Sequence, residues 1–377
     1  MKVQGTEKIL QSNFRLSRNL KSRKKIKLTT IGGFGRYGNQ LIRYFFLLHL
    51  KFIHEADIEY NSWIGEKFYT IQAGNAKIEP EEKAYALNCE IDELIRLQSS
   101  LLYQFRYRNT PCEKIMKQAR YFDKKILPMD EFIFNSETAF NTIEITGYFT
   151  RNTSIFSQTK AKIINEFRYQ KSILNFLEPI EAYLKQQGKT IVTIHIREGD
   201  AVGAQLILGE LFFVVPLVWY VKFLKANWNK WEDPILYISG RSSSDLSKLF
   251  GQFNYIDLNV LKAEKQLIQP ELLPYISLAD QEMIIEHHIM QISDFLVIPN
   301  STFSFTAAML NRNPNAIFYR PSIALKDFFV FDPWNAPVYQ REYFYSWRFI
   351  RHIGVKGILQ GCYFIIKCVL SGKGVFS

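Results

Sequence analysis

The second half of the chain alternates short apolar runs with longer segments of helical spacing, and this alternation restricts the fold more than any other feature. Residues 190–196 form a continuous, mostly apolar run, as expected of a parallel strand buried on both faces. Strands and helices in turn predict a parallel sheet covered by helices on both sides. We expect strands at Thr190–Ile196, Pro234–Ser239, Tyr255–Leu258, Phe295–Ile298 and Ala316–Tyr319, and helices at Pro216–Ala226, Ser243–Phe250, Leu278–Ser293 and Phe303–Asn311.

The first half of the chain begins with the same order of strand, loop and helix. A strand at Ile26–Ile31 leads through a glycine-rich loop into a helix at Asn39–His54. Two more strands, at Ile58–Tyr60 and Ile143–Thr146, and a mostly helical stretch at 158–187 are expected, whereas 75–140 follows no clear pattern. The predicted fold class is α/β, with two Rossmann-like domains facing each other across a cleft. The expected division is a basic N-terminal extension (1–25), an N-terminal domain (26–187), a C-terminal domain (188–335) and a basic, aromatic tail (336–377).

Positive charge is concentrated at the two ends of the chain. Of a net charge of +11, residues 1–30 supply +8 and residues 341–377 supply +5, which leaves the body at −2. A nucleic-acid enzyme more often spreads basic residues over its working face, so we expect no nucleic-acid partner. Basic tails with aromatic residues suit an anionic membrane surface, and the alternative is that they only aid solubility. No signal peptide is recognisable and the apolar stretch Ala201–Val221 is broken by polar residues, so we expect a cytoplasmic protein, with peripheral contact to the inner membrane face as a hypothesis.

No pattern typical of a metal site is present. The four cysteines match neither a zinc nor a redox spacing, and His287 and His288 are adjacent and point apart on a helix. There is no HExxH or DxD motif, and Asp332-Pro-Trp334 is interpreted as a turn. We therefore expect no metal and no cofactor.

Three polar clusters follow predicted strands, where ligands bind in open α/β sheets. The first is Gly32–Gln40, in which Gly35 and Gly38 let the backbone approach a ligand and Asn39 stands near a helix start. The order is neither the GxGxxG of a nicotinamide enzyme nor a P-loop. A plain strand-to-helix turn is the alternative interpretation.

The second cluster is His195-Ile-Arg-Glu-Gly-Asp200, directly after the buried strand. The planar fork of Arg197 suits a diphosphate, because it makes paired, charge-assisted hydrogen bonds. His195 lies two residues before Arg197, so in an extended chain both side chains point to the same side. The alternative is a structural salt bridge from Arg197 to Glu198 or Asp200.

The third cluster is Asn300-Ser-Thr-Phe-Ser304, between a strand and a helix. Hydroxyl groups and free amides at a helix start form an anion site. Ordinary capping by Ser301 or Thr302 is the alternative. A neighbouring arginine at the end of a strand favours the anion site.

In this order the clusters resemble the fucosyltransferase superfamily, nearest the bacterial α-1,2-fucosyltransferases of glycosyltransferase family 11. The resemblance covers about residues 28–320. It rests on Gly35-Arg-Tyr-Gly-Asn-Gln40, Gly147-Tyr148-Phe149, His195–Asp200, Leu236–Ser239 with Asp245, and Asp294 through Ser304. It departs from the family at Glu198, where a second arginine is usual, and at Phe305-Thr306, where two tryptophans are usual.

The resemblance implies a GT-B fold with an acceptor-side N-terminal domain and a donor-binding C-terminal domain. It also implies GDP-fucose as donor, inversion at the anomeric carbon, no required metal and a glycan acceptor, which the basic tail suggests is lipid-linked. Arg197 would bind the diphosphate and Asn39 would face the reaction centre. The base is left open between Glu198 and Asp200. The donor-binding set would be His195, Arg197, Gly35, Gly38, Ser301, Thr302, Ser304 and Phe305. Because of Glu198, a different nucleotide-sugar donor remains an alternative, as does a non-catalytic nucleotide- or glycan-binding protein.

Overall fold

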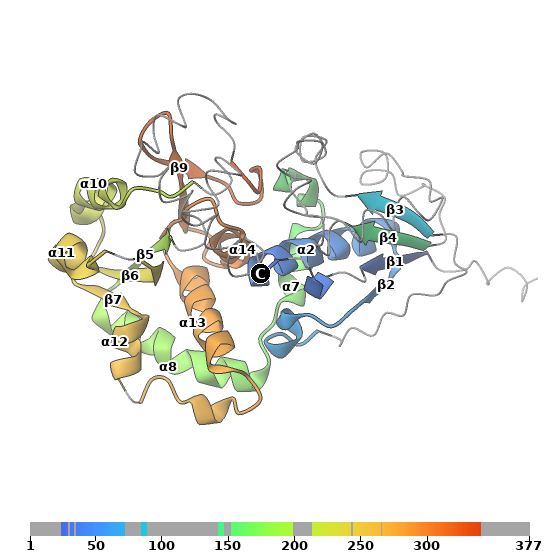
Figure 1. The fold of residues 1–377 in the computed structure, drawn as a ribbon, viewed down its shortest axis with the longest axis horizontal. Helices are drawn as coiled ribbons and strands as arrows, with labels where there is room; N and C mark the ends of the chain where they lie inside the picture. Colours follow the sequence, from blue (N-terminus) through green and yellow to red (C-terminus); the bar gives the residue numbers. More distant parts are fainter. Residues whose placement is uncertain are drawn as a thin grey trace, which may run out of the picture.

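The computed structural model describes residues 24–28, 31–33, 35–71, 84–88, 142–146, 152–198, 213–242, 244–264 and 266–340. These residues form two sheets with helices packed on them, so the fold class is α/β, as predicted. The sheets lie at opposite ends of the molecule in Figure 1, with α2 (Tyr37–His54) and α14 (Thr302–Leu310) between them. Residues 1–23, which are most of the basic N-terminal extension, and residues 341–377 lie outside the described residues, so the membrane hypothesis stays a prediction.

The first sheet has four parallel strands in the order β2-β1-β4-β3. Its strands are β1 (Lys25–Leu28), β2 (Asp57–Tyr60), β3 (Ala84–Asn88) and β4 (Thr142–Thr146). The predictions of β1, β2 and β4 are confirmed, whereas β3 falls in the region that followed no clear pattern. After the short 3-10 turn η1 (Ile31–Gly33), α2 begins at Tyr37, two residues before its predicted start.

The second sheet has six strands in the order β10-β9-β8-β5-β6-β7. They are β5 (Thr190–Arg197), β6 (Pro234–Arg241), β7 (Tyr255–Asp257), β8 (Phe295–Val297), β9 (Ile317–Ser322) and β10 (Asp327–Phe331). The prediction of a parallel sheet is confirmed for β5 to β9. The strand β10, which was not predicted from the sequence, pairs antiparallel with β9. The two strands are joined by a short turn with Lys326 in the left-handed region (φ 51°), and antiparallel neighbours need no crossover helix.

Helices cover both faces of the second sheet (Figure 1). One face carries α10 (Leu217–Asn227) and α11 (Leu246–Phe250), which share a core with Val192, Ile194 and Ile196 of β5. The other face carries α8 (Lys171–Gln187), α13 (Leu278–Ile292) and α14. The short helix α12 (Leu258–Ala263) follows β7. The prediction of a helix starting at Pro216 is confirmed, since Pro216 is the N-cap of α10.

Two consecutive helices, α7 (Lys160–Glu166) and α8, pack in different halves of the structure. The helix α7 packs against α2, whereas α8 packs against β5 and α13. The first residues of the predicted tail also belong to the packed body, because Ala336 and Val338 are buried. The domain boundaries expected at 187/188 and 335/336 stay predictions.

Candidate functional site

In the second sheet the strand connections reverse direction between β5 and β8, because the chain runs from β5 to β6 and β7 on one side and then to β8 and β9 on the other. Ligands of doubly wound α/β proteins bind beyond the carboxyl ends of the strands at such a point. Arg197 ends β5 and Asn300 follows β8, so two of the three predicted clusters stand at this point. The third cluster, the glycine loop, follows β1 of the first sheet.

At the end of β5, Arg197 and His195 both face α14, as predicted. The Arg197 Nη1 donates a hydrogen bond to the main-chain oxygen of Asn300 at 2.9 Å. The ring of His195 packs edge-on against Phe303, with 5.7 Å between the ring centres. On the same face Thr193 accepts a hydrogen bond from Ser293. The arginine is therefore attached to the segment that opens α14.

His195 is a buried, neutral side chain. Burial and then the charge of Arg197 lower the pKa of His195 to about 3. Its main-chain oxygen accepts a hydrogen bond from the Tyr220 hydroxyl at 2.9 Å, which holds this end of β5. Its ring Nδ1 is buried and has no hydrogen-bond partner within the described residues. A neutral imidazole leaves the positive charge of the site to Arg197.

The start of α14 is not capped by its own side chains. Ser301 is the N-cap residue, but its hydroxyl makes no capping hydrogen bond. Thr302 instead donates to Asn39 Oδ1 at 2.8 Å, so the predicted alternative of ordinary capping is not what the structure has here. Ser304 and Phe305 are buried, at 0% and 1% exposed, and pack inside the core beneath the helix start.

The glycine loop meets the start of α14 directly. A Cβ added to Gly38 would lie 2.4 Å from the Phe303 nitrogen and 2.6 Å from the Thr302 carbonyl carbon, so only glycine fits this contact. Gly35 has φ +68°, and a Cβ there would lie 2.2 Å from the Asn39 Nδ2. The two glycines are thus explained by the approach of α2 to α14 and by the placement of Asn39.

Asn39 connects the two sheets. Its Oδ1 accepts hydrogen bonds from the Thr302 hydroxyl at 2.8 Å and from the Tyr339 hydroxyl at 3.1 Å. Within the described part of the chain, nothing accepts a hydrogen bond from its Nδ2. The side chain therefore has its acceptor occupied and one donor group available.

Two residues that fix the surroundings of Arg197 and Asn39, Arg320 and Tyr339, were not predicted from the sequence. Arg320, on β9, is buried at 2% exposed, and burial lowers its pKa to about 9. It lies over the rings of Phe305 and Phe331 and donates to Asn300 Oδ1 at 3.1 Å. A charged residue directly after the predicted strand Ala316–Tyr319 was the available signal for it. Nothing in the sequence pointed to Tyr339, because it stands in the segment assigned to the tail.

The other predicted residues are placed as follows. Glu198 accepts a hydrogen bond from the Ser242 hydroxyl at 3.0 Å, between the ends of β5 and β6. Asp200 and the segment Gly147–Phe149 lie outside the described residues. His287 and His288 do point apart, His288 toward Glu181 and His287 toward Thr306. Asp332 to Trp334 is a turn, in which the Asp332 carboxylate accepts from the Trp334 nitrogen.

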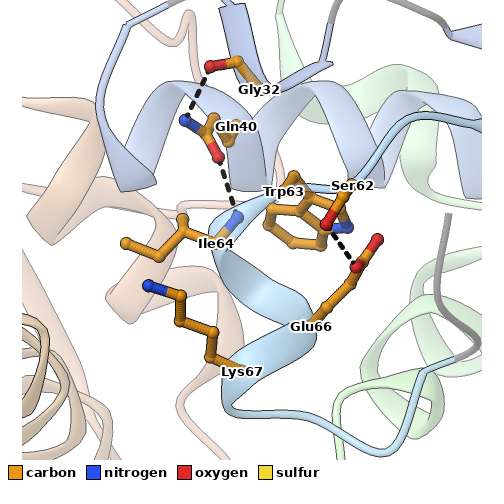
Figure 2. A pocket seen from close by; sticks show the side chains of 7 residues that line it. All are labelled: Gly32, Gln40, Ser62, Trp63, Ile64, Glu66 and Lys67. Carbon is orange, nitrogen blue, oxygen red and sulfur yellow. Dashed lines mark hydrogen bonds between the residues drawn. The ribbon is translucent and has the colours of Figure 1, made fainter. Parts of the chain in front are cut away.

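A pocket of about 540 Å³ borders the glycine loop on the side of the first sheet. Figure 2 shows Gln40 at its upper wall, donating to the Gly32 oxygen and accepting from the Ile64 nitrogen. The remaining wall is the turn η2 (Ile64–Lys67) with its flanks, where Ser62 donates to the Glu66 carboxylate at 2.8 Å. The pocket is thus lined by hydroxyl, amide and carboxylate groups beside the glycine loop.

No group of three or more histidine, cysteine, aspartate or glutamate side chains is arranged to hold a metal ion within the described residues. Of the helices in the described ranges, none has the length and apolar character to cross a membrane.

Comparisons with known proteins found likenesses of structure only. No protein-family model matches the chain, and no curated protein matches it. A crystal structure of NodZ α-1,6-fucosyltransferase soaked with GDP-fucose is similar, with a TM-score of 0.47 and 14% identity over 83% of this chain and 99% of that one. NodZ from Bradyrhizobium gives a TM-score of 0.44 at 14% identity over 83% and 99% of the two chains. A mutant of Arabidopsis thaliana FUT1 in complex with GDP gives 0.43 at 11% identity over 89% and 78%.

Proposed function

We propose that the chain is a glycosyltransferase that holds the diphosphate of a nucleotide-sugar donor between Arg197 and the start of α14. The observation that carries this proposal is the convergence of the three clusters. Arg197 is bonded to Asn300 at 2.9 Å, and Thr302 is bonded to Asn39 at 2.8 Å. Arginine suits a diphosphate by its fork, and uncapped amide groups at a helix start favour an anion. Both groups stand at the reversal point of the second sheet.

GDP-fucose is the proposed donor, on the strength of the motif resemblance. Glu198 is why a different nucleotide sugar stays the second candidate, since it removes a positive charge that the resembling family has. An α-1,2-like linkage, inversion, a two-domain GT-B cleft and a role in surface-glycan synthesis belong to the same proposal. A metal is not required in it, because an arginine and a helix start supply the positive field.

Transfer places negative charge on the departing nucleotide diphosphate while the sugar becomes positive. Fixed donors that are aimed at the developing charge lower the barrier, because they need no reorganisation during the reaction. Arg197 and the first amides of α14 are proposed as these donors. Asn39, through its available Nδ2, is proposed to bond the donor from the side of the first sheet. The glycan acceptor would enter the pocket beside Gln40, where its hydroxyl groups find amide and carboxylate partners.

An acceptor hydroxyl must also lose a proton, which calls for a base. Glu198 is the candidate among the described residues, and Asp200 is the second. Glu198 is already bonded to Ser242, so it is fixed in place near the end of β5. Replacing each by its amide, and comparing the pH dependence of transfer, distinguishes the two.

A screen of nucleotide sugars by thermal shift tests the donor. A ligand at a hundredfold excess over its Kd stabilises the folded state by about 2.7 kcal/mol, which raises the melting temperature measurably. We expect GDP-fucose and GDP to stabilise the chain more than UDP or dTDP sugars do, and Arg197→Ala to remove the effect. Stabilisation by UDP or dTDP sugars alone would replace the donor. Binding of GDP with no transfer to any glycan would favour the non-catalytic alternative.

A further inference from the structure

Residues 336–340 run from the second sheet back to the first. The Thr153 nitrogen donates to the Ala336 oxygen at 2.9 Å, and Pro337 forms a bridge with Asn152. Arg320 donates to the Pro337 oxygen at 2.7 Å, and Val338 is 1% exposed. This segment is therefore fixed on both sides before it reaches the site.

Tyr339 and Gln340, the last two residues of this segment, contact both halves of the site. The Asn300 side chain pairs with the main chain of Gln340, accepting from its nitrogen at 3.1 Å and donating to its oxygen at 3.2 Å. The main-chain oxygen of the same Asn300 is the one that accepts from Arg197. The Tyr339 hydroxyl donates to Asn39 Oδ1 at 3.1 Å, across 300 residues of sequence.

Tyr339 constrains which end of the Asn39 amide is presented to a ligand. With Oδ1 accepting from both Tyr339 and Thr302, the Nδ2 group is turned away from these two hydroxyls and toward Gly35. At Gly35 the absence of a Cβ leaves room for this orientation, since a Cβ would come within 2.2 Å of Nδ2. The amide is thus held at its Oδ1 end, while its Nδ2 end lies beside Gly35 of the glycine loop.

We propose that Tyr339 is a positioning residue, whose hydroxyl holds the Asn39 amide so that Nδ2 points at the bound nucleotide sugar. The Asn300 pairing with Gln340 anchors Tyr339 to the segment that holds Arg197. The start of the supposed tail thereby joins the two halves of one site. This inference rests on the proposed function, because the ligand that Asn39 faces is the donor proposed above.

A double-mutant cycle on turnover in the full-length chain tests the proposal. Tyr339→Phe keeps the ring and removes only the hydroxyl. We expect it to lower kcat about three- to tenfold, the factor that corresponds to one hydrogen bond, with the KM for GDP-fucose within about twofold of the original. In the Asn39→Ala background the same change should have no further effect. Tyr275→Phe, at a tyrosine that is 95% exposed, is the matched control and should leave both constants unchanged.

The proposal is overturned if Tyr339→Phe leaves kcat unchanged, or if it lowers kcat by the same factor with and without Asn39. A second cycle, on urea unfolding, separates this failure from failure of the proposed function. If the unaltered chain transfers no sugar, the glycosyltransferase assignment fails, and unfolding alone then decides whether Tyr339 acts through Asn39. Equal effects of Tyr339→Phe on unfolding in both backgrounds refute the link, and a smaller effect in the Asn39→Ala background supports it.

Discussion

Gly38 is where the contact between the two halves of the site is tightest, so Gly38→Ala is the most direct perturbation of the proposed arrangement. The added methyl would lie 2.4 Å from the Phe303 nitrogen and 2.6 Å from both the Phe303 Cα and the Thr302 carbonyl carbon. All three are main-chain atoms, so no side chain can rotate out of the way. Ordinary contact needs roughly 3.5 Å, so the starts of α2 and α14 must separate by about 1 Å.

Two effects of this substitution oppose each other in stability. Alanine inside a helix gains about 0.5–1 kcal/mol over glycine, and Gly38 lies in the first turn of α2. Overpacking a close contact costs about 1–3 kcal/mol, and here the strain falls on two main chains. We therefore expect a net loss of about 1–2 kcal/mol in the free energy of unfolding. For turnover the expected effect is larger, because a misplacement of about 1 Å costs roughly 100-fold in rate.

The assays are urea unfolding for stability and kcat with GDP-fucose for turnover, each compared with Gly251→Ala. Gly251 also lies in a helical turn, and nothing stands within 4 Å of a Cβ added there. This control should keep the activity of the original chain and gain slightly in stability. If Gly38→Ala behaved like Gly251→Ala in both assays, the close approach of α2 to α14 would not be part of the site, and the reasoning would be refuted.

Three further predictions concern charge and protonation. Arg197→Ala should lower kcat/KM by about 10²–10³-fold, and Arg197→Lys should restore only part of this loss, because lysine lacks the planar guanidinium fork. Near-normal turnover in the alanine variant would show that Arg197 is not part of the site. Asn39→Asp keeps an acceptor for both hydroxyls, but it lacks the Nδ2 donor and adds a negative charge. The rate of transfer should therefore fall at least about 100-fold, while the free energy of unfolding changes by less than about 1 kcal/mol. Stability and activity falling together would contradict this. Burial lowers the pKa of His49 to about 4 and of His195 and His287 to about 3, so the unfolded chain binds more protons as the pH falls below about 6.5. Each of these histidines should lower the free energy of unfolding at pH 5 by on the order of 2 kcal/mol. Equal urea midpoints at pH 7 and pH 5 would rule this out.

The elements around the site followed from the sequence because local patterns determine them. A short apolar run rich in β-branched residues favours a buried strand, so β5 and its polar end at His195 and Arg197 were predictable. Strand and helix in alternation then implied parallel neighbours, which brings the ends of β5 and β8 to one edge. The prediction that Arg197 and Ser301–Ser304 lie near each other followed from these two patterns alone.

The remaining contacts could not be predicted, because they depend on how the two sheets sit against each other. Tyr339 contacts Asn39 across 300 residues of sequence, and no local pattern marks a tyrosine in an irregular segment. The strand β10 was missed for a related reason. Its alternation is weak, and its pairing with β9 depends on a turn at Lys326 that carries no glycine, asparagine or aspartate.

The interface between the sheets is itself buried and hydrogen-bonded, and this bears on how a ligand reaches the site. The Tyr37 hydroxyl on α2 is bonded to Tyr69 at 2.9 Å, and its ring packs against His287 of α13 at 4.9 Å. Gln291 of α13 donates to the Tyr169 hydroxyl at 2.9 Å. Separating α2 from α14 would expose these rings and break buried hydrogen bonds, which is costly in free energy. A nucleotide sugar should therefore approach along the carboxyl ends of the strands, into a site whose halves are already joined, rather than by parting the two sheets.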